Sequence, residues 1–374
     1  SMSESRPEIL IAGSGPGALE ATLGLSASEY LDAKIALISP QLEFQYRPNL
    51  VMEPFGVTTT AKYAVAEVIR HPDVTQWSGT LERIDTAASK AYSPEGDEFD
   101  FDALIIATGT ETHADLNEPV VTFGKPGSLE KLKEIVAAID AGSVHSVLFT
   151  APPGPTWQLP LYEFALMCAE RAERQSGQQI VISIATPEAD PLDVFGAENS
   201  ATVLRLCADF GVVLHTDTTV EAFDGTTAHL SDGTSQAVDR VFAMPRLTGR
   251  APEGIPTDED GFIHVDDNQL IAGTTNVYAV GDVTDFRVKQ GGLASMQADA
   301  AICAIESTLG GREAAEPFVH EIDAILLAAD RRVAMRARIG NETSQSIAIE
   351  QPTGPVQKIQ SRLLSERLRE ISPL

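Results

Sequence analysis

Residues 8–26, EILIAGSGPGALEATLGLS, decide the fold of this chain. EILIAG is a short apolar run typical of a buried strand, and LEATLGLS has the spacing of a helix. Between them, GSGPGA from Gly13 to Ala18 matches the pattern G-x-G-x-x-G/A in the context where it binds a dinucleotide. A second apolar run, KIALIS, follows at 34–39. We therefore predict the opening of a parallel, doubly wound α/β sheet.

Each small residue of this turn has a physical task. Gly13 allows the tight turn, Gly15 lets the backbone approach a pyrophosphate, and Ala18 keeps helix and strand close. The start of the helix then presents N–H groups and a partial positive charge to the phosphates. At the end of the second strand an acid usually binds the ribose, but this chain has Ser39 followed by Pro40. An uncharged hydroxyl weakens the case for NAD here and is compatible with FAD.

The strand–helix–strand pattern occurs a second time, starting at Val144 with SVLFTA, PLYEFALMCAERAE and QIVISIA. This duplication predicts an α/β protein with two Rossmann-like dinucleotide-binding domains and a small C-terminal cap. The expected boundaries are 7–115 with 251–315 for the discontinuous FAD-binding domain, 116–250 for the second domain and 316–374 for the cap. Residues 116–128 are interpreted as a linker, EIDAILLAADRR at 321–332 as a helix, and 357–371 as a final amphipathic segment.

Three further motifs point to a flavin. Thr108-Gly109 ends a buried strand, and Gly281-Asp282 follows another, where the aspartate could accept a hydrogen bond from a ribityl hydroxyl. KQGGL at 289–293 leads two glycines into a helix, so free N–H groups there could stabilise negative charge on a reduced flavin. Lys289 could do the same as a point charge, or it could be a solvated surface lysine.

These motifs resemble, in order and spacing, the two-dinucleotide-binding flavoproteins of the pyridine nucleotide-disulfide oxidoreductase superfamily. Within it, ISPQLEFQYRPNLV, PLYE, TPEADPLDVFG and KQGGLASMQADAA are most similar to sulfide:quinone oxidoreductases and the flavoprotein of flavocytochrome c sulfide dehydrogenases. The resemblance covers about residues 8–310 and implies FAD as the cofactor. It also implies that Arg47 lies along the pyrophosphate side of the flavin. Leu81 is a candidate for a backbone contact with adenine. The expected cofactor-binding residues are Gly13, Gly15, Pro16, Gly17, Ala18, Ser39, Pro40, Arg47, Leu81, Thr108, Gly109, Gly281, Asp282, Lys289, Gln290, Gly291, Gly292 and Leu293.

The cysteines depart from the pattern of these relatives. Sulfide-oxidising members use two redox cysteines, the first of them five residues before the tyrosine of P-x-Y-E, where this chain has Trp157. No cysteine follows Cys303, and a relay needs two thiols within bonding reach. Cys168, Cys207 and Cys303 stand in apolar, helix-like contexts and are expected to be buried structural residues, with no metal site.

The loop of the second unit, APPGPT at 151–156, departs as well. Type II NADH dehydrogenases, which this chain also resembles, bind NADH on a glycine fingerprint there. Proline donates no N–H, so three of these six positions cannot take part in a phosphate cradle. Pro160 suits the first turn of the following helix, and Glu163 near its start would oppose an anion. Trp157 is expected to form a rigid apolar lid near the flavin or its acceptor, or else to pack between the domains without touching a ligand.

Composition sets the remaining limits. The net charge of −27 disfavours nucleic-acid partners. No apolar run reaches the roughly 18 residues of a membrane span, and the chain start does not look like a signal peptide, so a cytoplasmic protein is expected. The tail predicts weak membrane contact at most, or else a dimer or core face.

The predicted function is FAD-dependent electron transfer from a small donor to a quinone-like or protein acceptor, without a cysteine relay and with Trp157 and Lys289 as the catalytic candidates. Two alternatives stay open. One is an NAD(P)H:acceptor reductase with an atypical nicotinamide site, and the other is a flavin-binding interaction protein with little turnover.

Overall fold

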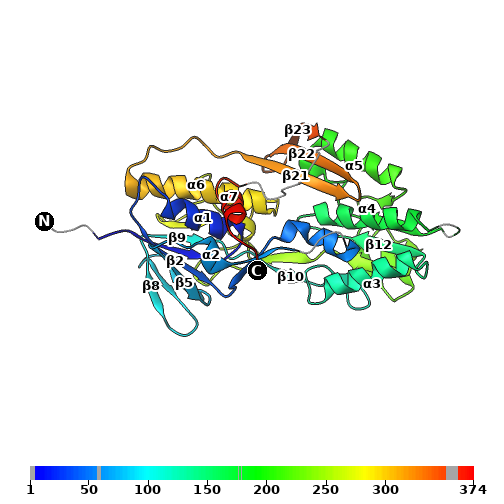
Figure 1. Ribbon diagram of the computed structural model, residues 1–374, viewed down its shortest axis with the longest axis horizontal. Coiled ribbons are helices and arrows are strands. Elements are labelled where there is room, and N and C mark those ends of the chain that lie inside the picture. The colour runs from blue at the N-terminus through cyan, green and yellow to red at the C-terminus, as the bar shows by residue number, and fades with distance from the viewer. Residues whose placement is uncertain (1–4, 57–59, 176, 178, 351–360) are drawn as a thin grey trace.

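The computed structural model describes residues 5–56, 60–175, 177, 179–350 and 361–374. Figure 1 shows two lobes, each built on a parallel sheet, with a C-terminal sheet reaching from one lobe to the other. The mixed α/β architecture predicted from the duplicated pattern is confirmed.

The first parallel sheet has the strand order β20-β9-β1-β2-β5. Its strands are β1 (Glu8–Ala12), β2 (Lys34–Ser39), β5 (Val74–Ser78), β9 (Ala103–Ile106) and β20 (Val277–Ala279). On one face, Ile9 and Ile11 pack with the helices α1 (Pro16–Ser26), α2 (Val65–Val68) and α6 (Gly291–Gly310). On the other face, Leu10 packs against a small antiparallel sheet of β6 (Arg83–Asp85), β7 (Lys90–Tyr92) and β8 (Glu98–Asp100). Both faces are therefore covered, as a parallel sheet requires.

The second parallel sheet repeats this arrangement with the order β11-β18-β12-β13-β14. Its strands are β11 (Val121–Thr122), β12 (Ser146–Thr150), β13 (Val181–Ala185), β14 (Val213–His215) and β18 (Arg240–Ala243). Helices α3 (Ser128–Asp140), α4 (Leu159–Glu173) and α5 (Ala197–Asp209) belong to the core on one face. The sheet of β15 (Val220–Phe223), β16 (Thr227–Leu230) and β17 (Ser235–Ala237) covers the other. β11 lies inside the expected linker 116–128, because it gains a partner in β18 that local sequence does not reveal.

Short elements complete the architecture. β10 (Thr110–His113) pairs with β19 (Arg246–Gly249), and β3 (Glu43–Gln45) pairs with β4 (Lys62–Ala64). Three 3-10 helices are η1 (Arg47–Phe55), η2 (Asp193–Phe195) and η3 (Gly281–Val283).

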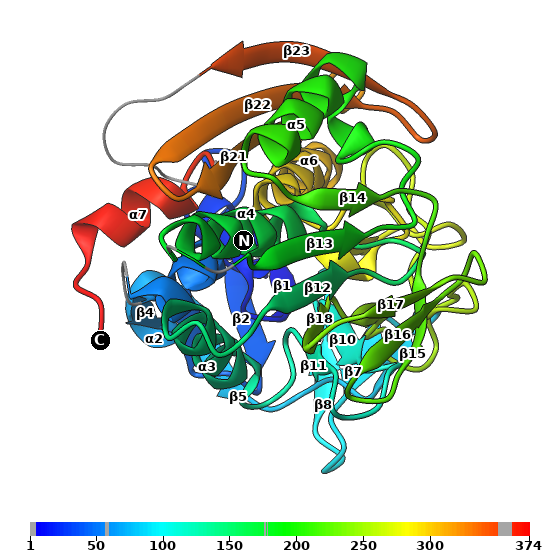
Figure 2. The same cartoon turned by 90° about the vertical axis from the view of Figure 1, so that its right-hand side faces the viewer.

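The prediction of a helix at 321–332 is wrong. This segment forms β21 (His320–Ala328) and the start of β22 (Arg331–Ile339), which also pairs with β23 (Ser344–Glu350). Ile322, Ile325 and Leu326 stand at the spacing i, i+3, i+4 and so imitate a helix, but Ile322, Ala324 and Leu326 alternate as the buried face of a strand. Pairing along the whole of β22 decides between the two, and Figure 2 shows the resulting sheet covering α4 and α5.

The described part of the tail packs against the first lobe. Helix α7 (Leu364–Glu370) buries Leu364 and Leu368 in the core beside α1 and α6. The carboxylate of Glu20, fully buried on α1, accepts hydrogen bonds from the N–H groups of Leu363 and Leu364. Arg367 donates to the carbonyl of Val68. The tail is thus a core face here, while residues 357–360 of the predicted amphipathic segment lie outside the described part of the chain.

We expect Asp299→Asn to flatten the dependence of folding stability on pH. Burial and the neighbouring Glu20 together raise the pKa of Asp299 to about 8, against the opposing effect of Arg362. The folded state therefore holds a proton that the unfolded chain releases near pH 4, so wild-type stability falls as pH rises from there to the raised pKa. The variant should gain on the order of 2 kcal/mol relative to wild type at pH 9 and about nothing at pH 4. Urea unfolding at both values checks this, and equal pH profiles would refute it.

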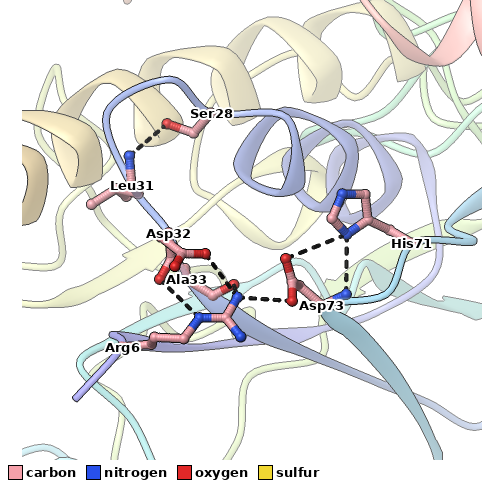
Figure 3. A network of polar contacts seen from close by, with 7 residues as sticks. All are labelled: Arg6, Ser28, Leu31, Asp32, Ala33, His71 and Asp73. Atoms are coloured by element: carbon pink, nitrogen blue, oxygen red, sulfur yellow. Dashed lines mark hydrogen bonds and ion pairs between the residues drawn. The ribbon is translucent and has the colours of Figure 1, made fainter. Parts of the chain in front are cut away.

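A polar cluster anchors the start of β1 (Figure 3). The guanidinium of Arg6 contacts Asp32 at 2.9 Å and Asp73 at 2.8 Å, and it donates to the carbonyl of Ala33. These carboxylates raise the pKa of Arg6. Because they lie just before β2 and β5, the cluster fixes the three strand starts relative to one another.

Among the helices of the described residues, none combines the length and the apolar character needed to pass through a lipid bilayer.

Candidate flavin site

Three glycine-bearing turns meet at one edge of the first sheet. β20, β9 and β1 are adjacent and parallel, so the turns that follow them emerge side by side. The N–H of Ala107 donates to Ala12 at 2.8 Å, and that of Val280 donates to Ile106 at 3.0 Å. The turns starting at residues 13, 107 and 281, far apart in the chain, therefore form a single site.

The first turn is shaped for close contact on one side and for open space on the other. Gly13 has φ of +128°, and a Cβ there would lie 2.0 Å from the carbonyl oxygen of Ala107. Gly15 is extended at the N-cap of α1, and no atom lies within 4 Å of where its Cβ would be. Helix α1 has no side-chain cap and no acid in its first turn. The helix thus presents backbone to an open space, as a phosphate-binding turn does.

Other predicted contacts lie around this turn. Ser39 is buried at the end of β2, and its hydroxyl accepts the N–H of Gln41 at 3.0 Å. Pro40 is exposed, and Leu81 is buried at the start of the β6–β8 sheet. Thr108 donates to the carbonyl of Arg250 at 2.6 Å. This hydroxyl is therefore engaged with the protein, and it ties the turn to the strand connection between the lobes.

Asp282 carries a carboxylate into this site between two cations. Burial raises its pKa, and the positive charges of Lys289 and Arg47 oppose that rise. Arg47 is exposed at the start of η1, so the chain segment after β2 reaches the same place as the turn after β20. Within the ranges that the structure describes, no group donates a hydrogen bond to the Asp282 carboxylate.

Lys289 is 2% exposed, so the alternative of a solvated surface lysine is wrong. Its ammonium donates to the carbonyls of Thr284 and Phe286 and lies 4.3 Å above the centre of the Phe262 ring. Burial lowers the pKa of Lys289 to about 8, against the raising effect of Asp282 and other acids. The side chain therefore holds the loop between η3 and α6 together.

The start of α6 is less open than expected. The side chain of Gln290 is its N-cap and accepts the N–H of Leu293 at 2.8 Å. The expectation of bare N–H groups is thus wrong for Leu293, because a side chain already satisfies that donor. Gly292 and Leu293 are both buried, which leaves the half-buried Gly291 as the most open residue of this turn.

Two residues that the sequence analysis missed support the Gly281 turn. Gln297, buried on α6, accepts the N–H of Gly281 at 2.7 Å, and its amide nitrogen lies 3.0 Å from Nε2 of His320. This amide orientation makes Nε2 the acceptor, so the imidazole proton is on Nδ1. Burial lowers the pKa of His320 to about 4, and its ring stacks on Phe286 at 3.7 Å. The only sequence signal was a glutamine inside an apolar helical pattern.

We expect Gln297→Ala to weaken FAD binding about tenfold, because the buried N–H of Gly281 loses its acceptor and the turn loses its position. His320→Phe is the matched control. It keeps an aromatic ring over Phe286 and leaves the Gln297–Gly281 bond in place, so binding should change less than threefold. Fluorescence titration of the apoprotein with FAD measures both, and equal losses would contradict this assignment.

The proline loop of the second lobe touches the flavin segment. Thr156 pairs with Val288 as in a parallel sheet. Trp157, half-buried, packs against Phe195 with ring centres 5.7 Å apart. Pro160 lies in the first turn of α4, as predicted. Glu163 is fully buried and accepts the N–H of Leu327, so it anchors β21. The prediction that it opposes an anion at the loop is wrong.

Two parallel sheets with the glycine-bearing turns at one edge are typical of the two-domain flavoprotein oxidoreductase fold, and comparison with known proteins agrees. Residues 163–302 match the family model described as pyridine nucleotide-disulphide oxidoreductase. This match covers residues 163–302 of the 374, and the whole chain has the fold of the two-domain flavoprotein oxidoreductases.

Several solved structures share the fold. The sulfide:quinone oxidoreductase of the hyperthermophilic bacterium Aquifex aeolicus is similar with a TM-score of 0.77 and 17% identity, over 92% of this chain and 87% of that one. A ferredoxin reductase from Rhodopseudomonas palustris has a TM-score of 0.65 and 18% identity over 89% and 82%. An NAD-dependent persulfide reductase from A. fulgidus has a TM-score of 0.63 and 18% identity over 90% and 64%.

The residues present fit FAD, the cofactor of the family whose model matches part of the chain. The open space before Gly15 and the uncapped start of α1 suit a pyrophosphate. The Asp282 carboxylate suits a hydroxyl donor, since the described chain offers it none. These three features belong to one edge of one sheet, as a single extended dinucleotide requires.

Proposed function

We propose that this protein transfers electrons from a small donor to a quinone-like or protein acceptor, with FAD as its cofactor and without a cysteine relay. The observation that carries the proposal is the convergence of the turns at 13, 107 and 281 on one sheet edge. When bound, FAD would supply the redox chemistry, and the protein would supply orientation and electrostatics.

The residues proposed to hold FAD are those of the three turns. Gly13 to Ala18 would face the pyrophosphate, with Arg47 as a nearby positive charge, and Asp282 would accept from a hydroxyl of the cofactor. Ser39, Leu81 and Thr108 to Gly109 would border the same groove. Residues 289–292 would face the end at which charge develops, since the start of a helix stabilises an anion there.

The cysteines support a mechanism without a thiol relay. Cys168 and Cys207 are buried, and burial raises the pKa of the Cys207 thiol to about 12 and that of Cys168 further. Both thiols are thus held in the protonated, unreactive form at neutral pH. Cys303 is half-buried on α6, on the helix that packs against α1, so it is less enclosed than expected. The position taken by a redox cysteine in sulfide-oxidising relatives is occupied by Trp157, which we propose as a rigid wall beside the reacting ring.

Anaerobic titration of the reconstituted protein tests the proposal. We expect the purified protein to bind added FAD and to show its visible spectrum, and one of a panel of small reductants to bleach it. A quinone or an oxidised ferredoxin should then restore the absorbance. A colourless protein that does not bind added FAD would refute the proposal.

The NAD(P)H-dependent alternative makes a different prediction in the same titration. Rapid bleaching by NADH or NADPH would favour it, and one neighbour that shares the fold is described as NAD-dependent. The prolines at 152, 153 and 155 argue against the usual nucleotide pose in this chain, because they remove backbone donors. A flavin that no reductant bleaches, together with a stable complex with another protein, would favour the interaction-protein alternative.

A further inference from the structure

The second lobe contains a cavity of about 380 Å³ next to the proline loop. It lies beyond the carboxyl ends of β12 and β13, between the loop 153–158, the segment 187–194 and residues 287–288. After β12 the chain adds β13 and β14 on one side of it, while β18 lies on the other side. The loop therefore stands at the topological switch point of the sheet, between β12 and β18. Ligands of open α/β sheets bind at such switch points, and the volume suits a small organic molecule.

The charges around the cavity are unusual for a nucleotide site. Two carboxylates line it, Glu188 in its wall and Asp193 at its exposed mouth. Glu188 is held in place by the hydroxyls of Tyr162 and Thr186 and by the N–H of Leu192, at 2.9 Å. These three donors favour the ionised form, but burial outweighs them and raises the pKa of Glu188 to about 7, so the carboxylate is mostly ionised only above that pH.

Arg287, the cation among the described lining residues, already binds other parts of the protein. Arg287 donates to the carbonyl of Gly340 at 2.9 Å and to the hydroxyl of Ser344 at 2.5 Å, so it fastens the β22–β23 hairpin. The prolines offer no N–H groups to an anion. The charge of Arg287 also lowers the pKa of Asp193, which burial raises, so this cation offsets part of that negative charge. A phosphate would still meet two carboxylates and one engaged cation.

An aromatic wall completes the cavity. Trp157 is half-buried, with its ring packed against Phe195 inside the protein while the residue also lines the cavity. A tryptophan face next to carboxylates is a combination that attracts organic cations, by cation–π attraction and by charge.

We propose that this cavity binds a small, planar organic cation without phosphate, such as an N-alkylpyridinium, between the face of Trp157 and the carboxylates of Glu188 and Asp193. The proposal concerns binding only. It goes beyond the proposed function, and it holds or fails independently of which compound reduces the flavin.

Three compounds that share one ring but differ in charge test this inference: 1-methylnicotinamide (positive), nicotinamide (neutral) and nicotinate (negative). The chain has two tryptophans, so Trp77→Phe leaves Trp157 as the only indole reporter in the FAD-loaded protein. We expect 1-methylnicotinamide to quench this fluorescence with a Kd at least about tenfold below that of nicotinamide, and nicotinate to bind more weakly than either. Equal affinities, or a preference for nicotinate, would overturn the proposal.

Variants then locate the site. Asp193→Asn and Glu188→Gln should each weaken the cation at least about threefold and leave nicotinamide unchanged, whereas Glu95→Gln, on the exposed β7–β8 turn of the other lobe, should change neither. If both carboxylate variants bind 1-methylnicotinamide with the wild-type Kd, the proposal is also overturned. The FAD spectrum, recorded in the same samples, shows whether flavin binding has failed separately.

Discussion

Gly15→Ala should lower the affinity for FAD by about 100-fold and leave the apoprotein almost as stable as wild type. Gly15 is extended at the N-cap of α1, a conformation that alanine adopts without strain, and its Cβ would meet no protein atom within 4 Å. The new methyl group would instead occupy the space in which a pyrophosphate must approach the backbone. A loss of this size corresponds to about 2.7 kcal/mol of binding free energy, whereas an N-cap change from glycine to alanine costs roughly 0.5–1 kcal/mol of folding stability.

Gly13→Ala is the matched contrast two residues away. Its Cβ would lie 2.0 Å from the carbonyl oxygen of Ala107, at a φ of +128° that side chains rarely adopt. This variant should destabilise the apoprotein itself, by about 3 kcal/mol or more. Thermal unfolding without FAD and fluorescence titration with FAD separate the two effects. If Gly15→Ala binds FAD as wild type does, the cofactor does not lie against this turn.

Lys289→Met should destabilise the protein by about 2–4 kcal/mol, with or without FAD. The change removes the donor for the carbonyls of Thr284 and Phe286 in a buried loop, and unsatisfied buried carbonyls are costly. Lys125→Met is the matched control. The ammonium of Lys125 also donates to a backbone carbonyl, that of Thr112 at 2.8 Å, but this lysine is only partly buried, so we expect a loss below about 1 kcal/mol.

The same variant tests the proposed electrostatic role of Lys289. Chemical unfolding of the apoprotein and the FAD-loaded protein should give the same loss if the lysine acts mainly on its own loop. A variant with normal apoprotein stability and a more negative flavin reduction potential would show instead that the ammonium acts on the cofactor. Both measurements use one preparation, so the two roles cannot be confused.

Local patterns were enough to predict the elements that recur in the fold. The apolar runs before the turns at 13 and 281, and the helix after Pro160, could be predicted directly because the hydrophobic periodicity and the positions of glycine and proline agree there. The segment 321–332 could not, since its apolar residues satisfy both a helical and an alternating pattern. Its hairpin pairing with β22, which follows after two residues, settles the choice, because strand pairing and burial override an ambiguous local pattern.

The site shows the same division. Sequence spacing named the three turns, but not Gln297 on α6 and His320 on β21, which support Gly281 through side-chain contacts. Nor did it show that Lys289 points into its own loop or that Gln290 caps α6. Side-chain direction and burial depend on packing between segments, which no short motif encodes.

The amino-acid sequence by itself determined the α/β class and the turns that would face a dinucleotide, because strand period, helix period and glycine placement are local properties of the chain. Only the tertiary structure decided that three distant turns share one sheet edge, that the C-terminal segment is a sheet, and that carboxylates and Trp157 line one cavity. The shared edge depends on strand pairing between residues more than 100 positions apart, whereas the C-terminal sheet and the cavity depend on contacts over shorter separations. Such contacts form only when parallel pairing and burial bring the segments together.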